Sequence, residues 1–137
     1  MTKYRPENSL CGLSHIGVYS CFCVVEPSSH LALIGLHAKP DKAVEEMQAL
    51  ADVHAAVEEH WNTDNIFIIG DLNADCDYAS QSELDSLTLR TDSRFSWLIG
   101  DEVDTTTKGT HCAYDRCACD IITHYFVTNL VRLQVNA

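Results

Sequence analysis

The sequence has 137 residues, of which 46% are hydrophobic and 21% are charged, and this length suits one compact domain rather than two. Nine basic residues against twenty acidic ones give a formal net charge of −11, which disfavours binding of nucleic acid through a basic face. No run of about eighteen apolar residues is present, so we expect no membrane span. The stretch Ser9 to Val25 contains Ser, His and Gly residues, so it makes a poor signal-peptide core.

The first predicted element is a strand over residues 31–36. This run is apolar on both faces, as expected of a strand buried on both sides, and it ends at His37. Pro40 then breaks the strand, and a helix is predicted from Asp41 to about Trp61, with Asp41 as its N-cap. Apolar residues recur along this helix at spacings of three and four, forming one stripe: Leu50, Val53, Val57 and Trp61.

A turn over residues 62–65 precedes a second apolar run, 66–69, which predicts another buried strand that stops at Gly70 and Asp71. The order strand, helix, strand predicts a βαβ unit, in which the two strands run parallel. Because parallel strands end at the same edge of a sheet, His37 and Asp71 should emerge together. Ligands of α/β proteins usually bind at this edge.

The later elements have weaker patterns. Residues 83–89 are compatible with a short helix, and residues 94–99 with a strand or a buried turn. Residues 104–109 are typical of a loop. The end of the chain, 121–135, is rich in β-branched and aromatic residues and predicts a final strand.

The loop after the second strand has the residue types of a hard-cation site. Asp71 and Asn73 are two residues apart, so both side chains can project from the same side of the chain. Carboxylate and amide oxygens suit magnesium or calcium, with phosphate completing the coordination. Asp75 and Asp77 crowd the same loop, where a divalent ion or a protonated carboxyl would relieve their repulsion. The alternative is an ordinary acidic turn, with His37 a hydrogen-bonded histidine.

The sequence contains seven cysteines, a density that favours an oxidising compartment. Two pairs, Cys21 with Cys23 and Cys117 with Cys119, have one intervening residue. Structural zinc sites usually have about two to four, so ordinary thiols are favoured over a zinc module.

Four motifs occur in a fixed order: LHAKP at 36–40, IGDLNADCDY at 69–78, LRTDSRFSWLIGDEVDTT at 89–106 and THCAYDR at 110–116. In sequence, order and spacing they resemble the secreted deoxyribonuclease I family. The resemblance covers residues 31–116, with 1–30 a poorly matched N-terminal segment and 117–137 a divergent C-terminal segment. It implies an α/β fold, the four-layer α/β/β/α sandwich of the family, of which this chain would supply part, with one sheet largely absent.

The resemblance implies a divalent-metal-dependent endodeoxyribonuclease that hydrolyses DNA phosphodiester bonds. It implies catalytic roles for His37, Asp71, Asn73 and Asp115, and for His124 as a displaced second histidine that Asp115 orients. The favoured alternative for His124 is a strand residue in an unrelated final segment. The resemblance also implies Mg²⁺ at Asp71 and Asn73, Ca²⁺ at Asp104 and Thr106, DNA contacts at Asn73, Thr106 and Tyr114, and a disulfide between Cys76 and Cys112.

This chain departs from the family pattern in three places. Two N-terminal glutamates of the family, one a metal ligand and one the partner of the first histidine, have no convincing counterpart. Thr123 stands where the second histidine motif has an aspartate, and Lys108 departs from the pattern of the calcium loop. We therefore expect an impaired or inactive nuclease, with a catalytically dead fragment that binds DNA or protein as the alternative.

The resemblance also sets expectations for partners and location. DNA binding should be weak without metal. A half sandwich would expose an apolar sheet face and favour self-association, to which free cysteines could add. We expect a secreted protein or one of the secretory pathway, with the nucleus as the alternative.

Overall fold

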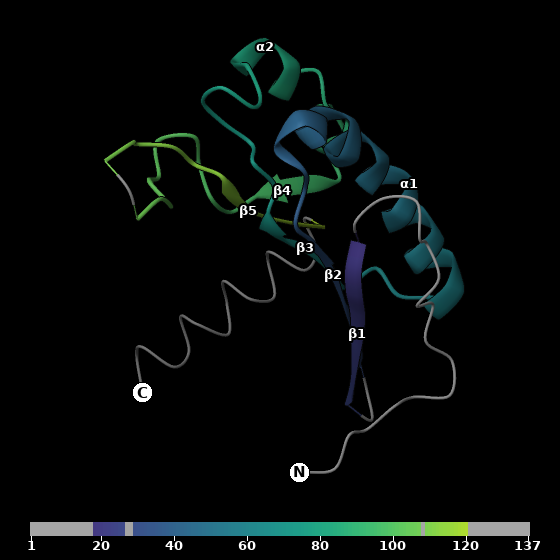
Figure 1. The fold of residues 1–137 in the computed structure, drawn as a ribbon. Helices are drawn as coiled ribbons and strands as arrows, with labels where there is room; N and C mark the ends of the chain where they lie inside the picture. The colour runs from purple at the N-terminus through teal and green to yellow at the C-terminus, as the bar shows by residue number, and fades with distance from the viewer. Residues whose placement is uncertain (1–17, 27–28, 108, 121–137) are drawn as a thin grey trace, which may run out of the picture.

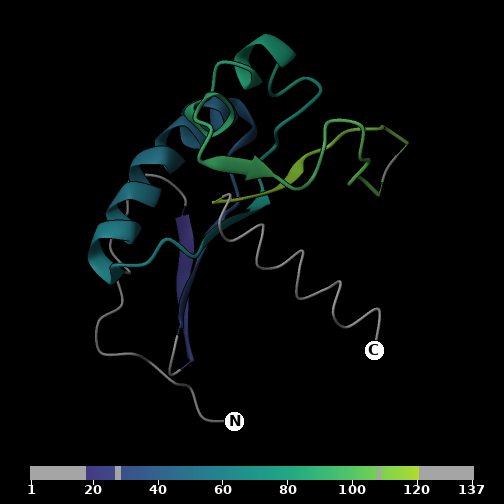
Figure 2. The ribbon, with the colours of Figure 1, turned by 180° about the vertical axis from the view of Figure 1, so that it is seen from behind.

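The computed structural model describes residues 18–26, 29–107 and 109–120. Its strands are β1 (Val18–Glu26), β2 (Ser29–Leu36), β3 (Ile66–Asp71), β4 (Phe95–Trp97) and β5 (Asp115–Asp120). They form one five-stranded sheet in the order β1-β2-β3-β5-β4, with the helices against one face (Figures 1 and 2). The expected α/β class is thereby confirmed.

The predicted βαβ unit is confirmed. Helix α1 (Ala43–Trp61) connects β2 to β3, and the two strands pair in parallel, from Ala32 opposite Ile66 to Gly35 opposite Ile69. This helix is long, but no helix in the described ranges is both long and apolar enough to cross a membrane. The parallel pairing brings the end of β2 and the end of β3 to one edge of the sheet.

The prediction of Asp41 as the helix N-cap was wrong. A 3-10 turn, η1 (Pro40–Lys42), precedes α1, and Lys42 occupies the N-cap position without a side-chain cap. Pro40 has the fixed φ that suits the first position of such a turn. Oε2 of Glu46, in the first turn of α1, accepts the backbone N–H of Lys39 at 3.0 Å, so this glutamate ties the segment before the 3-10 turn to the helix.

The sheet has one buried face and one open face. Alternate residues of β2 and β3 pack with α1 in the core: Ala32, Ile34, Ile66 and Ile68 lie against Met47, Leu50, Val53 and Val57. The residues between them point the other way, and there Ile69 is 48% exposed. The face that lacks helices, called the open face below, therefore carries apolar side chains.

Gly70 lets the ends of β2 and β3 approach closely. Its φ is +151°, and a Cβ at this position would overlap the carbonyl oxygen of Leu36. Any larger residue would push the strand ends apart. The position of Asp71 beside the end of β2 therefore depends on this glycine.

The single short helix expected over 83–89 is two helical turns instead. Helix α2 (Gln81–Leu84) begins with a capping box between Ser80 and Glu83, and α3 (Thr88–Thr91) follows. Leu87 between them is extended, with φ −63° and ψ 139°, which interrupts the helix. The strand expected within 94–99 is β4.

Strand β5 was not predicted. It lies inside the sheet and pairs antiparallel with both β3 and β4. The expected boundary after Arg116 falls within it, and the strand expected over 121–135 lies outside the described residues. Its sequence, DRCACD, has three charged residues, of which Arg116 and Asp120 are buried. Both have partners in other elements, and Nε2 of His54 lies 3.0 Å from Oδ2 of Asp120.

Candidate functional site

Three predicted site residues gather at one edge of the sheet. His37 follows β2, Asp71 ends β3 and Asp115 begins β5. Nε2 of His37 lies 3.5 Å from Oδ2 of Asp71, and these side chains are 69% and 40% exposed. The N–H of Ala38 donates to the carbonyl oxygen of Asp71 at 2.9 Å. The prediction that His37 and Asp71 emerge together is confirmed.

Asp71 and Asp115 are directly opposite each other in the antiparallel pairing of β3 and β5. Opposed residues of a sheet point to the same face, so the two carboxylates share the open face near His37. The N–H of Asp115 donates to Oγ1 of Thr105 at 3.1 Å, which fixes the start of the strand. His124, which Asp115 was expected to orient, lies outside the described residues.

Asn73 connects the two loops that follow β2 and β3. It is 6% exposed and has a left-handed φ of +49°. Its N–H donates to Oδ1 of Asp71 at 3.2 Å, and its Nδ2 donates to the carbonyl oxygen of Ala38 at 2.8 Å. Because Nδ2 is engaged by Ala38, the amide oxygen is the atom of this side chain that remains to act as a ligand.

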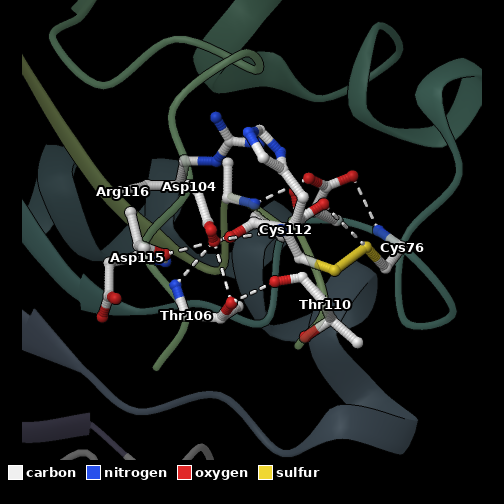
Figure 3. The surroundings of a disulfide bond; sticks show 12 residues. Cys76, Asp104, Thr106, Thr110, Cys112, Asp115 and Arg116 are labelled. Atoms are coloured by element: carbon white, nitrogen blue, oxygen red, sulfur yellow. Dashed lines mark hydrogen bonds between the residues drawn. A yellow bond between two sulfur atoms is a disulfide. The ribbon is translucent and has the colours of Figure 1, made fainter. Parts of the chain in front are cut away.

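A second loop, 104–114, is bonded to the loop after β3. The N–H of Leu72 donates to the carbonyl oxygen of Tyr114 at 3.0 Å, and the N–H of Ala113 donates to Oδ2 of Asp75 at 2.7 Å. Cys76 and Cys112 form a disulfide between the two loops, with a Cα–Cα distance of 6.0 Å (Figure 3). The expected disulfide is confirmed, and Asp75 is a residue whose bridging role the sequence did not reveal.

Asp104 and Thr106 form a compact turn beside the disulfide (Figure 3). Oδ1 of Asp104 accepts the N–H of Thr106 at 2.9 Å and the N–H of Cys112 at 3.3 Å. The Thr106 hydroxyl lies 2.8 Å from the same oxygen and 2.6 Å from the carbonyl oxygen of Thr110, so it can donate to either. The bonds from Thr106 hold the pKa of the Asp104 carboxyl below its usual value.

Tyr114 pairs with Tyr78, a residue that sequence reasoning passed over. Their ring centroids are 5.4 Å apart with an interplanar angle of 39°, and Tyr78 is 40% exposed. Desolvation raises the pKa of the Tyr114 phenol, and Tyr78 and the nearby carboxylates add to this shift. Tyr114 is therefore a neutral hydrogen-bond donor at neutral pH.

Comparison with known proteins places these motifs in a family, although no protein-family model matches the chain. Deoxyribonuclease-1 of Bos taurus is 44% identical over 99 residues, which are 68% of this chain and 35% of that protein. Deoxyribonuclease-1-like 2 of Mus musculus is 47% identical over 89 residues, which are 65% of this chain and 32% of that protein. The chain is a relative of the deoxyribonuclease I family. It spans about a third of the length of these curated relatives.

A solved structure agrees with this relationship at the level of fold. The endonuclease domain of TRAS1, a telomere-specific non-LTR retrotransposon, has a TM-score of 0.56 and 18% sequence identity. The match covers 74% of this chain and 50% of that one. At this identity the likeness shows the fold alone, an α/β fold shared with an endonuclease domain.

The donor set of this deoxyribonuclease I relative fits a divalent ion only in part. Among residues 31–107 and 109–120, no three His, Cys, Asp or Glu side chains are grouped closely enough to hold a metal. Asp71 offers one carboxylate and Asn73 one amide oxygen. Magnesium commonly binds proteins through one or two carboxylates and takes its other ligands from water and phosphate.

The zinc alternative gains no support from the residues that can be placed. Burial raises the pKa of the Cys117 thiol, which disfavours the thiolate that zinc would need. In this relative of deoxyribonuclease I, the structure brings together His37, Asp71, Asn73 and Asp115. Asp104 and Thr106 lie in a neighbouring turn, which the bond from the N–H of Asp115 to Thr105 joins to the start of β5.

Proposed function

We propose that this chain carries part of a deoxyribonuclease site that cleaves DNA phosphodiester bonds by attack of water. The observation that carries the proposal is the 3.5 Å approach of His37 to Asp71 at a sheet edge, in a relative of the deoxyribonuclease I family. The exposed imidazole of His37 would move the proton of the attacking water. Asp115 lies opposite Asp71 and would orient a second histidine, for which His124 is the candidate.

Magnesium would be held by Asp71 and the amide oxygen of Asn73. A bound divalent ion would neutralise charge on the phosphate that is cleaved. The facing carboxylates of Asp71 and Asp115 favour a cation at this edge, because it would relieve their repulsion. Asn73 is well suited to such a role, since its bonds to Asp71 and Ala38 hold it between the two loops.

Calcium would bind at Asp104 and Thr106, in a structural role. The support is that Asp104 is kept ionised by the bonds it accepts, and that the Thr106 hydroxyl and the Thr110 carbonyl oxygen lie beside it. Oxygen donors of these kinds are the usual ligands of calcium. Such an ion would hold loop 104–114, from which Asp115 extends.

DNA would lie across this edge of the sheet, in contact with Asn73, Thr106 and Tyr114. The net charge of −11 argues against tight binding without metal. We therefore expect cleavage to depend strongly on divalent ions and to fall with added salt.

The test is nicking of supercoiled plasmid by the purified chain in magnesium and calcium. His37→Ala should lower the rate by about 10²- to 10⁴-fold, because proton transfer at the reacting centre contributes about that much. His60→Ala is the matched control, since it changes an exposed histidine at the far end of α1. Equal background nicking by the wild type and His37→Ala, with DNA binding retained, would favour the alternative, a binding fragment without catalysis.

We infer a secreted protein or one of the secretory pathway, because the Cys76–Cys112 disulfide needs an oxidising compartment to form. The nucleus is the alternative. Immunofluorescence of the tagged protein in animal cells would separate the two. A nuclear pool with reduced Cys76 and Cys112 would overturn the inference.

Self-association through the open face is a further proposal. Ile69 is half-exposed there and Phe67 and Cys117 are partly exposed on the same face. Sedimentation velocity should show oligomers that Ile69→Lys disperses. A monomer at every concentration would contradict this proposal.

A further inference from the structure

Arg116 is a buried cation that lies directly behind the loop of the candidate site. It follows Asp115 in β5, is 1% exposed and points to the helix side of the sheet, opposite Gly70. Its Nη2 donates to the carbonyl oxygen of Ala74 at 2.8 Å, and its Nη1 donates to the carbonyl oxygen of Ile99 at 3.1 Å. One guanidinium therefore joins the loop after β3 to the segment after β4.

The contact with Ala74 leads directly to the site residues. Ala74 is fully buried and adjacent to Asn73, whose side chain donates to the carbonyl oxygen of Ala38, next to His37. The N–H of Ala74 also lies 3.5 Å from the carbonyl oxygen of Tyr114. A shift of Ala74 would therefore move Asn73 relative to both His37 and Asp115.

The charge of Arg116 is paired with the carboxylate of Asp101, in the segment after β4. Nη1 lies 3.0 Å from Oδ1 of Asp101, and the guanidinium carbon lies 5.4 Å from the centroid of the Trp97 ring. Burial lowers the pKa of Arg116, whereas Asp101 and Asp75 raise it. A buried charge with fixed partners of this kind is costly to remove, because its partners are left unpaired.

Arg90 provides an internal comparison. It contacts the same Asp101, through Nη1 at 3.0 Å and through Nη2, and stacks on the same Trp97 ring at 4.5 Å. No bond from Arg90 to the loop after β3 is present among the described residues. The two arginines thus share the carboxylate and the ring but differ in the contact with Ala74.

We propose that Arg116 is a positioning residue of the candidate site, which holds the carbonyl of Ala74 and thereby sets the Asp71–Asn73 turn against His37 and Asp115. The expected effect of Arg116 on catalysis rests on the proposed function, whereas its effect on the position of the loop can be tested separately. The planar guanidinium reaches Ala74, Ile99 and Asp101 at once, whereas the single ammonium of lysine cannot reproduce this arrangement.

The experiment compares Arg116→Lys with Arg90→Lys in the full chain, by amide hydrogen exchange of residues 72–76 relative to residues 66–69. Arg116→Lys should speed exchange of residues 72–76 at least about 10-fold while exchange in β3 stays near wild type. Arg90→Lys should leave both unchanged. If Arg116→Lys does not fold, Arg116→Gln is compared with Arg90→Gln in the same way.

Plasmid nicking supplies a second readout. Arg116→Lys should lower kcat about 10-fold or more with KM for plasmid near wild type, because the phosphate contacts remain while the site geometry is disturbed. Equal exchange of residues 72–76 in the two variants, or a uniform rise over the whole sheet, would overturn the proposal. If the wild type nicks no DNA, the proposed function fails, and the exchange comparison still decides whether Arg116 holds the loop.

Discussion

Asp71 and Asp115 face each other across β3 and β5, so two carboxylates share one edge of the sheet. Like charges directly opposite one another destabilise a sheet by about 0.2–1 kcal/mol. We predict that Asp115→Asn raises the free energy of unfolding by about this amount in EDTA and reduces the stabilisation that added magnesium gives. Denaturant titrations with and without magnesium measure both effects, with Asp77→Asn as the control in the same acidic region. A loss of stability in EDTA would contradict the prediction.

The close approach at Gly70 leads to a second prediction. Gly70→Ala should destabilise the fold by about 3 kcal/mol or more, because the new Cβ would meet the carbonyl oxygen of Leu36 and strain the backbone. Gly109→Ala is a matched control, since a Cβ there meets no atom within 4 Å. Urea denaturation of both variants tests this prediction, and equal midpoints would show that the strand ends can separate without cost.

Loss of the disulfide should be costly. In the chain-entropy model, closing a separation of 36 residues stabilises the fold by about 4 kcal/mol. The double variant Cys76→Ser with Cys112→Ser should lose about that amount in chemical denaturation, whereas Cys117→Ser should lose much less. Peptide mapping without reductant should recover the linked Cys76 and Cys112 peptides, and free thiols at both positions would disprove the pairing.

The carboxyl of Asp101 should contribute to unfolding in acid. The hydrogen bond from Arg90, with the charges of Arg90 and Arg116, holds its pKa below the ordinary value of 3.8. The unfolded state therefore takes up the proton first as pH falls. The stabilisation is complete above about pH 4 and is lost as pH falls through the folded-state pKa. Asp101→Asn should narrow the difference in unfolding midpoint between pH 7 and pH 3, and an unchanged difference would contradict this assignment.

The sequence predicted the elements whose residues carry a clear hydrophobic period. The apolar runs at 31–36 and 66–69 each predict a buried strand, and the apolar stripe along α1 predicts a helix. The parallel pairing that places His37 beside Asp71 follows from the order of these elements. The start of α1 was misjudged because the 3-10 turn over Pro40–Lys42 takes in Asp41 and moves the N-cap position to Lys42.

Strand β5 was harder to predict because its sequence has the composition of a loop. Arg116 and Asp120 are tolerated in the sheet only because Ala74, Ile99, Asp101 and His54 supply partners from distant parts of the chain. The bridging role of Asp75 and the pairing of Tyr78 with Tyr114 likewise join parts of the chain that are distant in sequence. These contacts depend on tertiary packing, which the local pattern of residues does not record.

The charged residues of β5 also bear on how faithfully the sheet assembles. A slip of one residue against β3 would turn Asp115 toward the apolar core and Arg116 toward the open face, leaving a buried carboxylate and the loop carbonyls without their partners. The native alignment of β5 satisfies both side chains. The charged residues that make this strand hard to recognise in the sequence therefore specify its register, because a misaligned pairing with β3 would cost free energy.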